Sequence, residues 1–143
     1  GLGAHVATLI GEGAGVISLH QDVTITQAVS SSCFDFGGAR NKIVMVEQEF
    51  PSVQYFYNEQ RRLGARIETV ASADPIRIDL ERLLAAIDET TLLVPSSPGL
   101  FRSSYIVDAR AMVARAPRVG APGRLDAFQG RGPVPRGVGD RTV

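Results

Sequence analysis

The chain has 143 residues, which suits one domain of average size or a piece of a larger one. Its 15 basic residues balance its 15 acidic residues, so the net charge predicts no general attraction to nucleic acid or to a membrane surface. No run approaches the ~18 apolar residues of a membrane span, and the first residues lack the basic start of a secretory signal, so we expect a cytoplasmic protein.

Residue types that often carry chemistry are scarce in this chain. Cys33 is its only cysteine, which excludes an internal disulfide and a cysteine-rich zinc site, and its 2 histidines are too few for most histidine-based metal sites. We therefore expect no metal centre. Lys42 is the only lysine among the 15 basic residues, which limits the lysine chemistry that is available. The chain begins with Gly1 rather than Met, which hints at a fragment or a processed product.

The amino-terminal part of the chain predicts two helices and a short strand. Residues 2–10 resemble the end of an apolar helix and are followed by a glycine-rich turn. Residues 16–19 are a strand candidate, and residues 22–34 predict a helix for which Asp22 is a suitable N-cap. Cys33 falls late in this helix, and we expect it to be a small core residue rather than a nucleophile.

The middle of the chain alternates short apolar strands with helices. Residues 42–46 predict a fully buried strand, since their apolar side chains do not alternate with polar ones. Pro51 suits the first turn of a helix, Gly64 suits its end, and Asp79 suits the cap of another helix. The remaining expected elements are helices over 53–63, 80–87 and 105–116 and strands over 65–70, 91–95 and, more weakly, 124–128.

This alternation predicts an α/β fold, a three-layer and mainly parallel sheet with helices on both faces. We expect residues 1–130 to form such a domain in incomplete form. Residues 131–143 are rich in glycine, proline and arginine and lack apolar periodicity, so we expect an irregular or disordered tail there.

The start of the helix over 22–34 is a candidate anion site. Thr24 and Thr26 place two hydroxyl groups in or near its first turn, where N–H groups and the helix dipole favour an anion. A strand that leads into such a turn is a plausible phosphate site. On these residues alone, a helix that is merely capped by Asp22 is the simpler interpretation.

Two further segments place useful side chains at the carboxyl ends of expected strands, where open α/β sheets bind ligands. Phe50 could set an aromatic face over a flat ligand, although a place in the core is the alternative. Asp126 and Gln129 supply a carboxylate and an amide, and Asp126 could instead be a turn residue. The sequence contains neither a G-x-G-x-x-G motif nor a P-loop, so no motif supports a dinucleotide or nucleoside-triphosphate site.

The order of several stretches resembles the large domain of fold-type I pyridoxal-phosphate (PLP) enzymes, specifically the class V aminotransferase group that includes kynureninase. The resemblance lies in LHQDVTITQAV, EFPSVQYFY, TLLVP, LFRSSYIVDARAMVARA and RLDAFQG, in family order across residues 5–130. It implies PLP as the cofactor, a small amino-acid substrate for full-length relatives, and a homodimer, which is common in the family.

The resemblance also implies roles for particular residues. Val23 and Thr24 match the turn that gives the PLP phosphate its backbone and hydroxyl contacts. Phe50 matches the aromatic residue that stacks on the pyridine ring in kynureninase-like members. Asp126 matches the carboxylate that pairs with the pyridine nitrogen, and Gln129 matches a position near the cofactor that His or Gln occupies.

Several family features are not found in this sequence. The family holds PLP as a Schiff base on a lysine some tens of residues after the aspartate, whereas Lys42 stands on the opposite side of the motif order. The C-terminal domain that would supply an arginine for the substrate carboxylate is also missing, and residues 96–99 depart from the family pattern. We therefore expect a truncated large domain with little or no turnover as an isolated chain. The alternatives are a degenerate, non-catalytic α/β fragment or interaction module, and an unrelated α/β binding domain.

Overall fold

A computed structural model describes residues 1–9, 13, 15, 17–97, 99–108, 111 and 123–125. The helices are α1 (Leu2–Leu9), α2 (Val23–Ser31), α3 (Pro51–Glu59), which the 3₁₀ turn η1 (Gln60–Leu63) extends, and α4 (Leu80–Ala86). The strands are β1 (Lys42–Val46), β2 (Arg66–Val70), β3 (Thr91–Ser96) and β4 (Gly123–Leu125). Among the described helices, none combines the length and the apolar character that crossing a bilayer requires.

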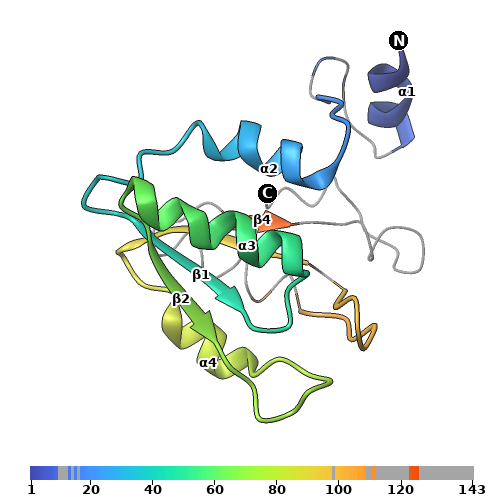
Figure 1. The fold of residues 1–143 in the computed structure, drawn as a ribbon. Helices are drawn as coiled ribbons and strands as arrows, with labels where there is room; N and C mark the ends of the chain where they lie inside the picture. The colour runs from blue at the N-terminus through green and yellow to red at the C-terminus, as the bar shows by residue number, and fades with distance from the viewer. Residues whose placement is uncertain are drawn as a thin grey trace.

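The strands form one parallel sheet in the order β2-β1-β3-β4 (Figure 1). In this register Ile43 of β1 lies between Ile67 of β2 and Leu93 of β3, and Ser96 of β3 lies opposite Leu125 of β4. The chain passes from β1 to β2 through α3, and α4 then leads it to β3 on the other side of β1. The parallel sheet with intervening helices confirms the predicted α/β class.

Helices cover both faces of the sheet because the central strand is apolar on both sides. One face packs against α3, in a cluster made of Phe36, Ile43, Met45, Val53, Tyr57, Ala65 and Leu93. The other face packs against α4, in a cluster made of Val44, Val46, Val70, Ile78, Leu83, Ile87, Val94, Leu100 and Val107. α2 lies against α3, on the same side of the sheet (Figure 1). The result is the expected arrangement of three layers.

β2 is an outer strand of the sheet and differs from β1 in its side chains. Arg66, Glu68 and Thr69 are exposed, whereas every residue of β1 is buried. Charged side chains along an outer strand discourage pairing with another chain. The number of apolar residues in each strand therefore distinguishes the central strand, β1, from the outer strand, β2.

Two expectations for the secondary structure are wrong in detail. Residues 17–19 are not in a strand, because a strand needs a hydrogen-bonded partner and the described residues supply none for them. The helix over 105–116 does not begin at Tyr105, since Ile106 instead forms an antiparallel bridge with Gly99. The Asp108 carboxylate accepts the N–H of Ala111 at 3.0 Å, as an N-cap would.

The expected core position of Cys33 is also wrong, because the structure exposes this residue. α2 ends at Ser31, so Cys33 lies beyond the part of the helix that packs on α3. The expected strand over 124–128 overlaps β4 (Gly123–Leu125), and its residues 126–128 lie outside the described part of the chain. The expected tail over 131–143 lies outside the described residues.

The cap of α2 provides a test of the local structure. The Asp22 carboxylate accepts the N–H of Ile25 at 2.9 Å, which satisfies a donor that has no partner within the helix. We expect Asp22→Ala to lower the free energy of unfolding by about 1 kcal/mol. Urea denaturation measures this loss. The exposed neighbour Gln21 provides the control, and an equal loss in Gln21→Ala would contradict the capping role.

Candidate functional site

All four strands run in the same direction, so their last residues lie at one edge of the sheet, which we call the carboxyl edge. Val46, Val70, Ser96 and Leu125 end the strands there. α2 and α3 lie side by side, and both begin on the side to which the strand arrows point (Figure 1). The structure therefore brings the start of α2 and the segment that follows β1 to the same side of the sheet.

The first turn of α2 leaves one hydroxyl group open for a ligand. Thr26 is not that group, because its Oγ1 donates a hydrogen bond to the backbone carbonyl of Asp22 at 2.9 Å. Thr24 is exposed, and its hydroxyl makes no hydrogen bond within the described part of the chain. Val23 is half-buried and heads the helix. The helix dipole at this end favours an anion beside the Thr24 hydroxyl.

Phe50 lies at the carboxyl edge with a large part of its ring open to solvent. It is the N-cap residue of α3, directly before Pro51, and 42% of its surface is exposed, so it is not a core residue. Its ring meets the ring of Phe101 edge to face, with 4.9 Å between the centroids and 73° between the planes. The Arg102 guanidinium lies 5.5 Å from the centroid of the Phe101 ring. A partly exposed aromatic ring held by a second ring suits a flat ligand.

Two carboxylates tie the segment after β1 to the segments that follow the neighbouring strands. Glu49 is buried, and its carboxylate accepts the backbone N–H of Ser97 at 2.8 Å and the Ser97 hydroxyl at 3.0 Å. Glu47 accepts the backbone N–H of Ser72 at 2.9 Å. The sequence pattern predicted neither link, and Ser97 belongs to the stretch 96–99 that departs from the family pattern. A glutamate pair just after a buried strand is the signal that could have indicated them.

Two of the expected site residues belong to the part of the chain that the structure does not describe. Asp126 and Gln129 lie outside the described residues. In the sequence, Asp126 directly follows Leu125, the last described residue of β4, which pairs with Ser96 at the carboxyl edge. Among the described residues, no group of three His, Cys, Asp or Glu side chains is arranged to hold a metal ion.

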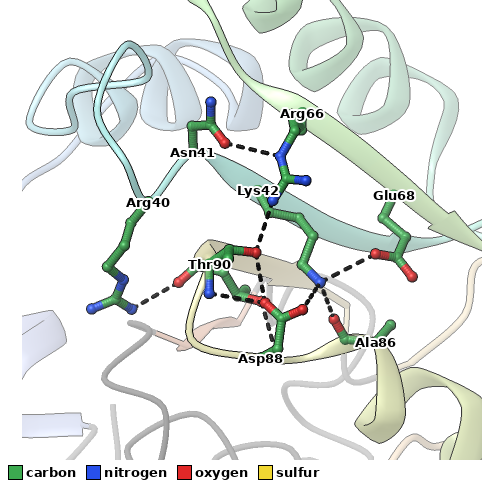
Figure 2. A network of polar contacts seen from close by, with 9 residues as sticks. Arg40, Asn41, Lys42, Arg66, Glu68, Ala86, Asp88 and Thr90 are labelled. Atoms are coloured by element: carbon green, nitrogen blue, oxygen red, sulfur yellow. Dashed lines mark hydrogen bonds and ion pairs between the residues drawn. The ribbon is translucent and has the colours of Figure 1, made fainter.

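Lys42 belongs to a polar network at the opposite edge of the sheet. It begins β1, so Val46 at the carboxyl edge lies four residues further on, or about 13 Å along the strand. Lys42 is buried, and its ammonium donates to the Ala86 carbonyl at 2.6 Å and to the Asp88 carboxylate at 2.7 Å (Figure 2). A third contact reaches the Glu68 carboxylate at 3.2 Å. The Lys42 ammonium thus already has three protein partners. It lies at the opposite edge of the sheet from Phe50.

The network also lowers the pKa of Asp88, the acid that Lys42 contacts most closely. The hydrogen bond from the Lys42 ammonium, followed by that from the Thr90 hydroxyl, holds the pKa of Asp88 well below its usual range. Asp88 in turn accepts the backbone N–H and the hydroxyl of Thr90 at 2.9 and 2.7 Å. These contacts join the start of β1 to the turn before β3, which is a structural role.

Solved structures define the class of protein that has this fold. A C-DES mutant with glycine covalently linked to its PLP cofactor matches with a TM-score of 0.79 and 17% identity, over 91% of this chain and 35% of that one. The cystine C–S lyase C-DES in complex with its product, cysteine persulfide, matches with a TM-score of 0.58 and 17% identity, over 66% and 27% of the two chains. O-acetylhomoserine sulfhydrylase of Wolinella succinogenes matches with a TM-score of 0.55 and 19% identity, over 71% and 28%. The fold is that of part of the large domain of PLP-dependent enzymes.

The sequence comparison gives a more particular relative. Kynureninase of Geobacillus thermodenitrificans is 28% identical to this chain over 147 residues, which is 99% of this chain and 33% of the kynureninase. No family model matches the chain. The resemblance to kynureninase-like enzymes is therefore confirmed, and the chain spans about a third of the length of that relative.

Proposed function

We propose that this chain supplies part of the PLP-binding site of a kynureninase-like enzyme that acts on amino acids. The proposal is carried by two observations: Thr24 offers an open hydroxyl in the first turn of α2, and the exposed ring of Phe50 directly precedes α3. The two helices lie side by side and begin on the same side of the sheet (Figure 1). The similarity to kynureninase and the shared fold with PLP enzymes support it.

The described residues fit a phosphorylated, flat cofactor. A phosphate needs donors and a favourable dipole, and the first turn of α2 offers the Thr24 hydroxyl together with the N-terminal end of a helix. A pyridine ring needs an aromatic or apolar partner, and Phe50 offers a partly exposed ring that Phe101 contacts at 73° between the ring planes. The fit of these two groups does not depend on Asp126 or Gln129.

Each residue of the proposed site then has a definite task. The Thr24 hydroxyl donates to the phosphate, and the backbone at Val23 adds the dipole of the helix start. Phe50 sets the plane of the ring. We propose that the Asp126 carboxylate holds a proton on the pyridine nitrogen and that Gln129 lies beside the ring. When bound in such enzymes, PLP supplies an electron sink for the substrate.

We further propose that this chain by itself binds PLP without covalent attachment and turns over little or no substrate. Its one lysine, Lys42, is held by Asp88 and Ala86 at the opposite edge of the sheet. The parent enzyme is proposed to be cytoplasmic and homodimeric, to act on a small amino acid, and to bind neither nucleic acid nor membrane. A degenerate, non-catalytic fragment or interaction module is the competing function.

Titration of the full chain with PLP tests this function. We expect saturable binding by calorimetry, with pyridoxal, which lacks the phosphate, binding about tenfold more weakly because it loses one charge-assisted contact. Phe50→Ala is expected to weaken PLP binding about 3- to 10-fold, since an aromatic stack contributes about 0.5–1.5 kcal/mol. Tyr55→Ala removes another exposed aromatic ring from α3 and serves as the matched control, with no expected change.

Two outcomes oppose the proposal. Equal, weak binding of PLP and pyridoxal that neither variant alters would favour the non-catalytic fragment. Borohydride reduction followed by peptide mass spectrometry locates any covalent adduct. An adduct on Lys42 would contradict the assignment of the site to the carboxyl edge.

A further inference from the structure

Glu49 is a carboxylate buried directly beside the proposed ring-binding residue. Only 2% of its surface is exposed, although its neighbours Glu47 and Phe50 are both exposed. Its two oxygens accept the backbone N–H and the hydroxyl of Ser97, at 2.8 and 3.0 Å. Burial of a carboxylate is costly unless hydrogen bonds replace its water. These bonds therefore hold the segment after β1 and the segment after β3 in one relative position.

The two aromatic rings of the site come from these same two segments. Phe50 follows Glu49 in the chain, and Phe101 lies four residues after Ser97. Their edge-to-face contact, 4.9 Å between centroids, depends on how the segments are placed. Among the described residues, the Glu49–Ser97 link is a hydrogen-bonded tie between these two segments, one residue from Phe50 and four from Phe101.

The backbone on each side of the link is itself restrained. The Gln54 side-chain amide donates to the carbonyls of Glu47 and Glu49, both at 2.8 Å, which restrains the segment that leads into α3. In the other segment, the Ser104 N–H donates to the Leu100 carbonyl at 2.8 Å. The first restraint holds the backbone at Glu49, next to Phe50, and the second closes a turn around Phe101, so a tie between the two segments acts on the placement of both rings.

We propose that Glu49 is a positioning residue that sets the plane of the Phe50 ring for stacking on the cofactor, a role that rests on the proposed function. Glu49 does not touch the ligand. It acts through the Phe50–Phe101 pair, because the Ser97 contacts hold the Phe101 segment in place and thereby fix the angle at which the two rings meet.

Calorimetric titration of the full chain with PLP tests the proposal through a double-mutant cycle. Glu49→Ala is expected to weaken PLP binding about 5- to 10-fold, and to have no further effect when Phe50 is already alanine. Glu49→Gln is expected to restore binding to within about threefold of wild type. Its Oε1 can accept the Ser97 N–H while its Nε2 donates to the hydroxyl, which can accept as well as donate.

Glu47→Ala is the matched control, because it breaks a similar link from the same segment, but to Ser72 rather than Ser97. We expect it to leave PLP binding within about twofold of wild type. A loss in Glu49→Ala that persists in the Phe50→Ala background, or an equal loss in Glu47→Ala, would overturn the proposal, since either shows a general effect on the fold.

Aromatic NMR of the ligand-free chain separates this proposal from the proposed function. We expect nuclear Overhauser contacts between the Phe50 and Phe101 rings in wild type and Glu47→Ala, and their loss in Glu49→Ala. If wild type shows these contacts but binds no PLP, the proposed function fails and the ring-positioning role is still judged by the Glu49 variants. Ring contacts that survive in Glu49→Ala overturn the role whatever the binding result. Should Glu49→Ala not fold, Ser97→Ala, which removes only the hydroxyl contact, is measured in its place, with a partial loss expected.

Discussion

Gly64→Ala is expected to lower the free energy of unfolding by about 2–4 kcal/mol. Gly64 ends the 3₁₀ turn after α3 with φ 104° and ψ −1°, a conformation that strains any residue with a side chain. A Cβ atom at this position would lie 2.8 Å from the Phe36 carbonyl oxygen and 3.2 Å from the Gly37 Cα. Both atoms belong to the backbone, so the strain cannot be relieved by turning a side chain.

The matched control for this prediction is Gly37→Ala, on the other side of the same contact. A Cβ atom on Gly37 would approach only the carboxylate of Asp35, at 3.4 Å, and Gly37 does not have a positive φ. We expect its loss to stay within about 1 kcal/mol. Urea unfolding of the two variants measures the difference. Equal losses of unfolding free energy in the two variants would show that the backbone of the turn adjusts to a Cβ atom at Gly64. Such a result would contradict the role assigned to Gly64.

Lys42→Met is expected to lower the free energy of unfolding at neutral pH by about 1–3 kcal/mol. The substitution keeps the buried methylene chain but removes the ammonium from the Ala86 carbonyl and from the Asp88 carboxylate. Asp88 and Glu68 are both partly exposed, so water can replace some of the lost contact. For that reason the loss falls below the ~3–5 kcal/mol that follows when a fully buried ion pair is broken.

The same substitution is expected to change how stability depends on pH. The folded protein lowers the pKa of Asp88, so this carboxyl stabilises the fold above the pKa of the unfolded chain, near 4, and the contribution is lost as the pH falls below that value. Lys42→Met removes the largest cause of the shift, so the decline in stability on acidification should be shallower than in wild type. Urea midpoints between about pH 6 and pH 3 measure this decline.

Glu68→Gln is the control for the Lys42 network. Glu68 lies 3.2 Å from the Lys42 ammonium and is 46% exposed, so we expect a loss below about 1 kcal/mol. If Lys42→Met loses stability on acidification as steeply as wild type, other carboxyl groups control the loss of stability at low pH. That result would contradict the importance of the Lys42–Asp88 pair.

The candidate site was predictable only in part. The start of α2 and the position of Phe50 after β1 follow from local patterns and from the family resemblance. The sequence pattern did not show that the Thr26 hydroxyl donates a hydrogen bond to the Asp22 carbonyl. That bond leaves Thr24 as the open hydroxyl of the first turn. Nor did it show that Phe50 is exposed beside Phe101, because the sequence alone allowed a core position.

By itself, the sequence determined the elements and most of their ends. β1 and β3 are apolar without alternation, the caps at Asp22 and Asp79 are short acceptors before helices, and Gly64 ends a turn where a positive φ is required. These features depend on hydrogen bonds and burial within a few residues, so a local pattern is enough to predict them. Residues 17–19 do not form the predicted strand for the complementary reason, since pairing in a parallel sheet joins segments that are far apart in the sequence.

Only the tertiary structure decided which of these elements meet, and therefore where chemistry can occur. Glu49 forms hydrogen bonds with Ser97, 48 residues further along the chain, and Lys42 forms one with Asp88, 46 residues further along. The two pairs lie at opposite edges of one parallel sheet. No local pattern encodes such a pair, because its formation depends on the order β2-β1-β3-β4 and on the register of neighbouring strands. That order separates the chain's one lysine from Thr24 and Phe50, and places two aromatic rings together at the carboxyl edge.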